Sequence, residues 1–383
     1  MNITLTGLWA LRVMRMVRRG EVEGSSLNRR VSLSPADPSP RKRWSAASID
    51  LSAFGIAFDE KHPLTVAVPS AAGRLRMRNV TNTVYSRGLP EGSFIDVGHG
   101  VCIPCPELLF IELASVMDAP VHVLLGLELC GRFARDSRDP RDGDVAYGLE
   151  PLTSADKIRA FISSCKSVRD LAYAAERAQY VMDNAWSPME AILATVMRLP
   201  YGEFGYDLGP LVLNGRVDAP ERLVPYVEKA SRVPDIVLEG TRVGVNYDGE
   251  IHLDLTEIVR RAAAGEDVDE AVERVREKYV DDRRRDRELL MQGYYVLPAT
   301  SEDLYRDGGL DKLIGQVIEL AEQTAGLDLG PQRRMIELRK YSKGRQRVIW
   351  SLLPGVRGRE LARKLAGSSF MTFELVAEET IYL

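Results

Sequence analysis

The order of predicted elements between Ser187 and Gly326 restricts the fold more than any other feature of this chain. Apolar residues recur at helical spacing in 187–199, and three β-rich segments follow in 211–254. A strongly charged helical pattern covers 267–293, after which YYVLPAT predicts one more short strand and SEDLYRDGGLDKLIGQVIELAEQTAG one more helix. This alternation predicts an α/β domain with a mixed sheet.

Side chains suited to phosphodiester chemistry stand on these elements. They are Glu190 on the first helix, Asp235 in the strand VPDIV, Asn246 and Asp248 in the strand VNYDG, and His252 soon after. Hydrolysis of a phosphodiester needs one or two hard divalent cations, which carboxylate oxygens hold. We therefore expect Asp235 and Asp248 to hold Mg²⁺, for which Mn²⁺ can substitute.

Each of these residues also has a simple structural explanation when it is taken alone. Glu190 fits the third position of a capping box that begins at Ser187. An Asp after Pro is usually a turn residue, and Tyr-Asp-Gly is more often a hairpin turn than a site. The functional interpretation therefore depends on the combination of residues, in this order and on these elements.

The combination resembles the very-short-patch-repair-like branch of the PD-(D/E)XK nucleases. The resemblance is carried by the Pro-Asp pair at 234–235, NYDG at 246–249, His252, DDRRRDRELLMQG at 281–293 and the strand YYVLPAT. It implies a restriction-endonuclease-like fold and hydrolysis of DNA. It also implies that Asp235 is the main metal ligand, that Glu190 ligates the metal or positions water, and that His252 acts as a general base or positions water.

One position departs from that pattern, because Asn246 stands where most relatives have Glu. An amide carbonyl can ligate a cation but brings no charge, so the affinity for a divalent cation should fall. Asp248 lies two residues further along the strand and points to the same face, where it can take over. Asn246 stays a candidate site residue, and activity is the property that this substitution puts in question.

Two functions follow from these observations. The first is a metal-dependent DNA endonuclease, or a degenerate descendant of one. The second is a non-catalytic DNA-binding antitoxin or transcriptional regulator that keeps the nuclease fold as a scaffold. Asn246 favours the second function, whereas Asp235, Asp248 and His252 favour the first. A third hypothesis is a pure protein-interaction module.

The N-terminal half carries a looser resemblance. HPLTVAVPS and VYSRGLPEGSFIDVGHGVCIPCPELLFIELA, which lie between 62 and 135, are β-rich and end in a helical pattern. They resemble the type IV abortive-infection antitoxin family of bacterial defence systems, which implies a small α+β domain and a partner toxin. A basic arm stands in place of the winged helix usual in that family, with nine Lys or Arg and three acidic residues up to Ser45.

The sequence therefore predicts five parts. They are a basic N-terminal helix and linker at 1–50, an α+β antitoxin-like domain at 51–150, a helical connector at 151–186, a nuclease-like domain at 187–325 and a basic C-terminal extension at 326–383. The net charge of −4 provides no global basic field, so DNA contacts must come from local patches such as this extension. A solvated helical face explains its basic residues equally well.

Cysteine use and hydropathy indicate the compartment. Four cysteines in 383 residues do not make a disulfide framework, so a reducing cytoplasm is expected. No run approaches the ~18 apolar residues of a membrane span, and arginines interrupt the apolar N-terminal stretch, unlike a signal peptide. Cys102 and Cys105, with His99 three residues before, fit a zinc site, although cysteine is often simply buried. No feature indicates an oligomeric state.

Overall fold

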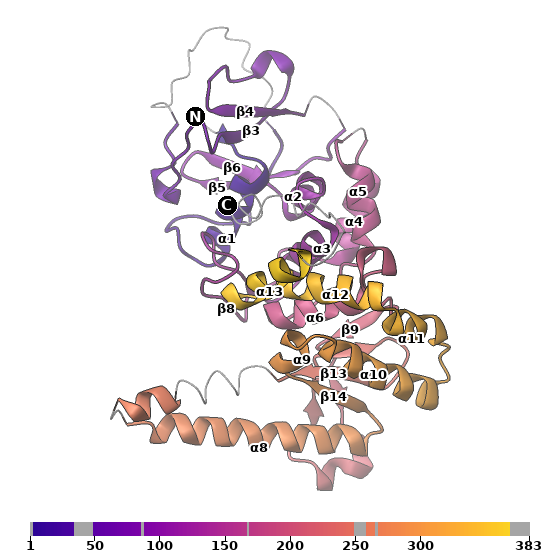
Figure 1. Ribbon diagram of the computed structural model, residues 1–383. Helices are drawn as coiled ribbons and strands as arrows, with labels where there is room; N and C mark the ends of the chain where they lie inside the picture. Colours follow the sequence, from indigo (N-terminus) through magenta and orange to yellow (C-terminus); the bar gives the residue numbers. More distant parts are fainter. Residues whose placement is uncertain are drawn as a thin grey trace. The chain divides into compact units, whose positions relative to one another are not determined.

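The computed structural model describes residues 3–33, 49–85, 88–166, 168–248, 258–264 and 267–367. The described chain divides into two compact units, one up to Pro188 and one from Met189. Both units combine helices with sheets, which confirms the predicted mixture of α/β and α+β structure (Figure 1). The finer five-part division stays a prediction.

The N-terminal unit contains a four-stranded sheet in the order β1-β6-β5-β2. Its strands are β1 (Ile3–Thr4), β6 (Val101–Pro104), β5 (Phe94–Gly98) and β2 (Arg30–Val31), of which β1 runs parallel to β6 and the others are antiparallel. Two further pairs are β3 (Leu64–Val68) parallel to β4 (Val80–Val84), and β7 (Phe133–Ala134) antiparallel to β8 (Ala146–Tyr147). The strand-like patterns between 63 and 105 therefore do form strands.

The α-helices described in this unit are α1 (Gly7–Arg18), α2 (Pro106–Leu113), α3 (Ala119–Leu129), α4 (Ala155–Ser164) and α5 (Leu171–Ala178). The helical spacing near the N-terminus predicts α1, whose apolar stripe, including Leu11 and Met14, is buried in the core of the unit. The expected cap of α4 is also present, because the Ser154 hydroxyl accepts the backbone N–H of Lys157 at 3.2 Å.

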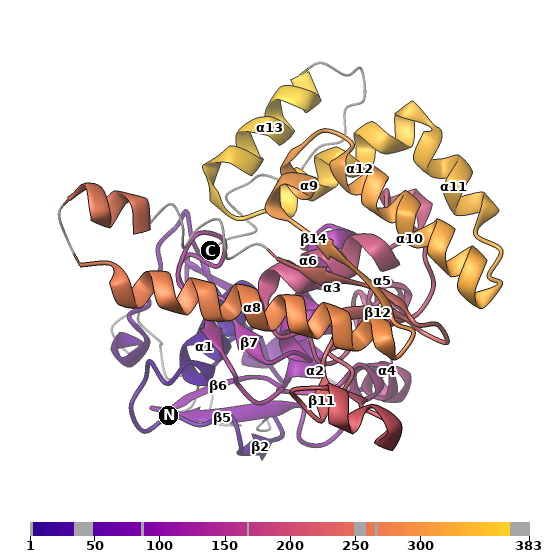
Figure 2. The ribbon, with the colours of Figure 1, turned by 90° about the horizontal axis from the view of Figure 1, so that it is seen from below.

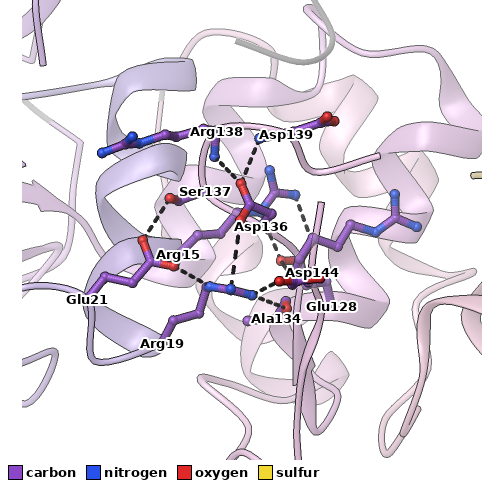
Figure 3. A network of polar contacts seen from close by, with 11 residues as sticks. Arg15, Arg19, Glu21, Glu128, Ala134, Asp136, Ser137, Arg138, Asp139 and Asp144 are labelled. Carbon is purple, nitrogen blue, oxygen red and sulfur yellow. Dashed lines mark hydrogen bonds and ion pairs between the residues drawn. The ribbon is translucent and has the colours of Figure 1, made fainter. Parts of the chain in front are cut away.

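Arginines at the end of α1 are bonded within the N-terminal unit (Figure 3). Arg15 is buried and donates to both carboxylate oxygens of Glu128 on α3, at 2.9 and 2.7 Å. Arg19 contacts the carboxylates of Glu21 and Asp136 and donates to the carbonyl oxygen of Asp144 at 2.8 Å. These arginines join α1 to α3 and to the 134–144 loop, so their positive charges are engaged inside the unit.

The C-terminal unit contains a four-stranded mixed sheet in the order β14-β13-β12-β9. Its strands are β9 (Leu211–Leu213), β12 (Ile236–Leu238) and β13 (Val243–Tyr247), which are antiparallel neighbours, and β14 (Tyr295–Ala299), which runs parallel to β13. A tight turn cannot join parallel neighbours, and the long helix α8 (Asp269–Met291) lies in the connection between β13 and β14 (Figure 2). A small antiparallel pair, β10 (Val217–Asp218) and β11 (Ser231–Arg232), completes the strands described here.

Helices precede and follow this sheet. α6 (Pro188–Arg198) comes before it, and α9 (Ser301–Tyr305) and α10 (Gly309–Ala325) come after it. The single helix expected over 301–326 is therefore wrong. Gly308 adopts φ +70°, a left-handed conformation that no right-handed helix can contain, so the chain ends one helix and starts another there.

Up to residue 367, where the described chain ends, the basic extension folds as three helices, α11 (Gly330–Glu337), α12 (Arg339–Leu352) and α13 (Gly355–Gly367). Arg345 of α12 is buried and donates to Asp311 of α10 at 2.7 Å, so one of the basic residues of this segment serves the interior of the unit. No helix in the described part of the chain is long and apolar enough to cross a membrane.

Candidate functional site

Asp235 and Asn246 lie opposite each other at the start of β12 and the end of β13. The register pairs Ile236 with Val245, so the residues just beyond that pair are cross-strand neighbours. The backbone N–H of Asp235 donates to Oδ1 of Asn246 at 2.9 Å, and the backbone N–H of Tyr247 donates to Oδ2 of Asp235 at 2.6 Å. Each of the two side chains therefore receives a backbone hydrogen bond from the other strand, and this fixes both.

The orientation of Asn246 bears on its expected role as a ligand. Its side chain is buried, with only 1% of the residue exposed. Oδ1, the atom that could ligate a cation, accepts the backbone N–H of Asp235, whereas Nδ2 has no hydrogen-bond partner in the described structure. In this arrangement Asn246 presents a donor to its surroundings and supplies no ligand oxygen.

Glu190 of α6 reaches the same strands through Asn214. Nδ2 of Asn214 donates to Oε2 of Glu190 at 2.8 Å, and the backbone N–H of Asn214 donates to the carbonyl oxygen of Asp235 at 2.9 Å. Asn214 has φ +49°, a left-handed conformation that asparagine tolerates better than most residues. Sequence reasoning assigned no role to Asn214, and the Asn-Gly pair after a short strand was the signal that could have singled it out.

The carboxylate of Asp235 is in an electrostatically unfavourable position for an anion. Its pKa is raised to about 7, first by burial and then by the carboxylates of Glu190 and Asp248, against the opposing effects of the Tyr247 N–H and the Arg285 guanidinium. Three acidic side chains expected at the site are thus brought together. A carboxyl group perturbed by burial and by like charges is typical of functional sites, although structural networks show it too.

Asp248 follows β13 and faces α8. Its backbone N–H donates to the carbonyl oxygen of Ala299 at 2.7 Å, which continues the pairing with β14 by one residue. Its carboxylate lies 3.7 Å from the guanidinium of Arg283 on α8. No site residue was expected on this helix, although 281–293 is one of the motifs that carry the resemblance.

His252, the fifth residue of the predicted site, lies outside the described residues. Its expected role as a general base or water-positioning group stays a prediction.

No protein-family model, curated protein or solved structure matches this chain. The site is therefore interpreted from its own residues and geometry.

The number and kind of side chains that can ligate a metal decide whether a divalent cation can bind at this site. Among the residues that the structure describes, no group of three or more His, Cys, Asp or Glu is arranged to hold a metal ion. Mg²⁺ commonly binds one or two carboxylates and takes its other ligands from water and from phosphates. Asp235 and Asp248 are both largely shielded from solvent and supply the two carboxylates of that mode of binding.

The cysteines do not offer a comparable zinc site. Cys102 and Cys105 are free and buried, and burial raises the pKa of both thiols, to about 11 for Cys102. Nε2 of His99 lies 2.9 Å from the carbonyl oxygen of Glu23, within hydrogen-bond distance. Burial accounts for these residues without a metal.

Proposed function

We propose that the unit from Met189 onward is a nuclease unit of the PD-(D/E)XK type, and that the protein is a Mg²⁺-dependent endodeoxyribonuclease. The observation that carries the proposal is the largely shielded carboxylate of Asp235, whose pKa is raised by burial and by the carboxylates of Glu190 and Asp248. Further support comes from the topology. A helix, three antiparallel strands, a crossover helix and a parallel strand follow one another in the order that the resemblance implies.

The residues of the site would have different roles. Asp235 and Asp248 would hold the cation, which when bound supplies positive charge to phosphate oxygens and lowers the pKa of a water. Glu190, which accepts a hydrogen bond from Asn214, would ligate the cation or position a water.

Contacts to the DNA backbone would come from the basic extension. Arg334, Arg339, Lys340, Arg357 and Lys364 are exposed on α11, α12 and α13. Arg333 pairs with Glu319 and Glu322, so it contributes less. We expect binding to duplex DNA to weaken at least about tenfold between about 50 and 200 mM salt, because phosphate contacts release counterions. Fluorescence anisotropy with a labelled duplex measures this, and an affinity independent of salt would count against the phosphate contacts.

A second function has one observation in its favour. Asn246 brings no charge to the site, and its oxygen is bonded to the backbone, so the carboxylate count is lower than in the nuclease pattern. A DNA-binding antitoxin or transcriptional regulator could keep the same unit as a scaffold without cleaving DNA.

Cleavage of supercoiled plasmid in Mg²⁺ or Mn²⁺ separates the two functions. We expect the wild-type protein to nick or linearise the plasmid and Asp235→Ala to lose this activity while it still binds the same DNA. Asp218→Ala, which changes an exposed carboxylate in the same unit, is the matched control and should cleave normally. Binding without cleavage in the wild type would favour the scaffold function.

A further inference from the structure

The rotation of α8 about its axis is fixed by a buried arginine on β11. Arg232 is buried and donates through Nε to Glu288 at 2.5 Å and through a terminal nitrogen to Asp281 at 2.9 Å. Lys229 adds a second contact to Asp281 at 2.9 Å. Two residues seven apart on α8 are thus tied to the same strand region, which sets the direction in which the neighbouring stripe of the helix points.

That neighbouring stripe carries Asp282, Arg285 and Asp286, spaced three and four residues apart. Arg285 lies 3.3 Å from Oδ1 of Asp282. On the same stretch of helix, Arg283 bridges two carboxylates, that of Asp248 at 3.7 Å and that of Asp286 at 3.4 Å. This part of α8 therefore lies against the end of β13, where Asp248 stands.

Asp282 is the most deeply placed of the helix carboxylates in this stripe. Only 8% of the residue is exposed, and its Oδ2 has no hydrogen-bond partner in the described structure. Burial raises its pKa, and Asp248 raises it further, against the opposing effect of Arg285. A buried carboxylate oxygen without a donor is costly, unless a cation or a proton satisfies it.

The region has more acidic than basic groups. Asp235 and Asp248 influence each other, as do Asp248, Asp282 and Asp286, and the cations that act on these carboxylates are Lys278, Arg283 and Arg285. Carboxylates gathered in excess of their counter-ions favour the binding of a cation.

We propose that Asp282 is a further carboxylate of the cation site formed by Asp235 and Asp248, and that it binds the ion through one of the ion's waters. Arg285 is the counter-ion of Asp282 until the cation arrives. This inference rests on the proposed cation-binding function. Contact through water agrees with the absence of a three-carboxylate ligand group among the described residues.

The affinity of the full-length protein for Mn²⁺ in the absence of DNA tests the inference, by calorimetry or by the electron paramagnetic resonance of the free ion. Asp282→Asn should weaken Mn²⁺ binding about tenfold, because it removes one negative charge close to a divalent ion. Arg285→Gln should strengthen binding severalfold, because it removes the competing positive charge. Glu277→Gln makes the same charge change as Asp282→Asn at an exposed position of α8 and should leave the affinity unchanged.

The opposite effects of Asp282→Asn and Arg285→Gln separate an electrostatic role from a structural one, since damage to the fold would weaken binding in both. Equal affinity in the wild type and Asp282→Asn, or weaker binding in Arg285→Gln, would overturn the inference. If the wild type binds Mn²⁺ as expected but does not cleave DNA, the inference stands and the nuclease function fails. If the wild type cleaves DNA but Asp282→Asn binds Mn²⁺ as tightly as the wild type, the nuclease function stands and the inference fails. A wild type that binds no Mn²⁺ at millimolar concentration overturns both.

Discussion

Glu112 on α2 makes the stability of the N-terminal unit depend on pH. One carboxylate oxygen accepts the backbone N–H of Gly7, at the start of α1, at 2.9 Å, and the other accepts the hydroxyl of Tyr85 at 2.6 Å. Burial raises the pKa of Glu112 to about 7 from an ordinary value of 4.5, and the two hydrogen bonds only partly oppose that effect. Between about pH 4.5 and pH 7, Glu112 therefore keeps its proton in the folded state but has lost it in the unfolded chain.

The direction and the size of the pH dependence follow from the raised pKa of Glu112. Because the folded pKa lies above the unfolded one, the contribution to stability is fully present below pH 4.5 and is lost as the pH rises through 7. A shift of this size corresponds to about 3 kcal/mol, at roughly 1.4 kcal/mol for each pKa unit. Glu112→Gln removes the titration but keeps an acceptor for Gly7 and a donor for the Tyr85 oxygen.

Calorimetric unfolding of the wild type and Glu112→Gln between about pH 5 and pH 8.5 measures the difference. As the pH rises across this range, the variant should become about 3 kcal/mol more stable relative to the wild type. This difference corresponds to roughly 6–12 °C in the Tm of the N-terminal unit. Other titrating groups are common to both proteins and cancel in the comparison. A difference in Tm that does not change with pH would refute the reasoning.

Two further predictions concern the buried ion pair of Arg15 with Glu128 and the position of Asn246, where the nuclease pattern has Glu. Arg15→Ala should destabilise the N-terminal unit by about 3–5 kcal/mol in chemical or thermal unfolding, because it leaves the buried carboxylate of Glu128 without its partner. Arg29→Ala removes an exposed pair with Asp96 and should cost less than about 1 kcal/mol; equal losses would contradict this account. Asn246→Glu should increase plasmid cleavage in Mg²⁺ and lower the Tm of the metal-free protein, because it adds a buried negative charge beside Asp235. Unchanged cleavage together with a lower Tm would mean that residue 246 does not face the cation.

The elements of the C-terminal unit could be predicted because each has a clear local pattern. Apolar spacing indicated α6, a charged helical pattern indicated α8, and β-rich runs indicated β9, β12, β13 and β14. The break at Gly308 was missed, because a glycine inside a helical pattern is often tolerated and only its left-handed φ decides the matter. The mixed sheet was expected, but its strand order came from the structure.

The candidate site was predictable only in part, because side-chain pairing depends on distant residues. Asp235 and Asp248 stood out through their place in short motifs, and their proximity was expected from adjacent strands. The role of Asn214 depends on a contact with Glu190, 24 residues away, that no periodicity encodes. For the same reason the sequence showed only a basic N-terminal helix, whereas Arg15 has its partner 113 residues away on α3.

The central claim is that Asp235 and Asp248 hold a divalent cation, and diffraction from crystals soaked in Mn²⁺ tests it most directly. The account predicts an anomalous peak that lies within about 2–2.3 Å of a carboxylate oxygen of both residues, with waters in the remaining positions. The same soak of Asp235→Ala crystals should give no peak there. Wild-type crystals that bind Mn²⁺ elsewhere, or not at all at millimolar concentration, would contradict the claim.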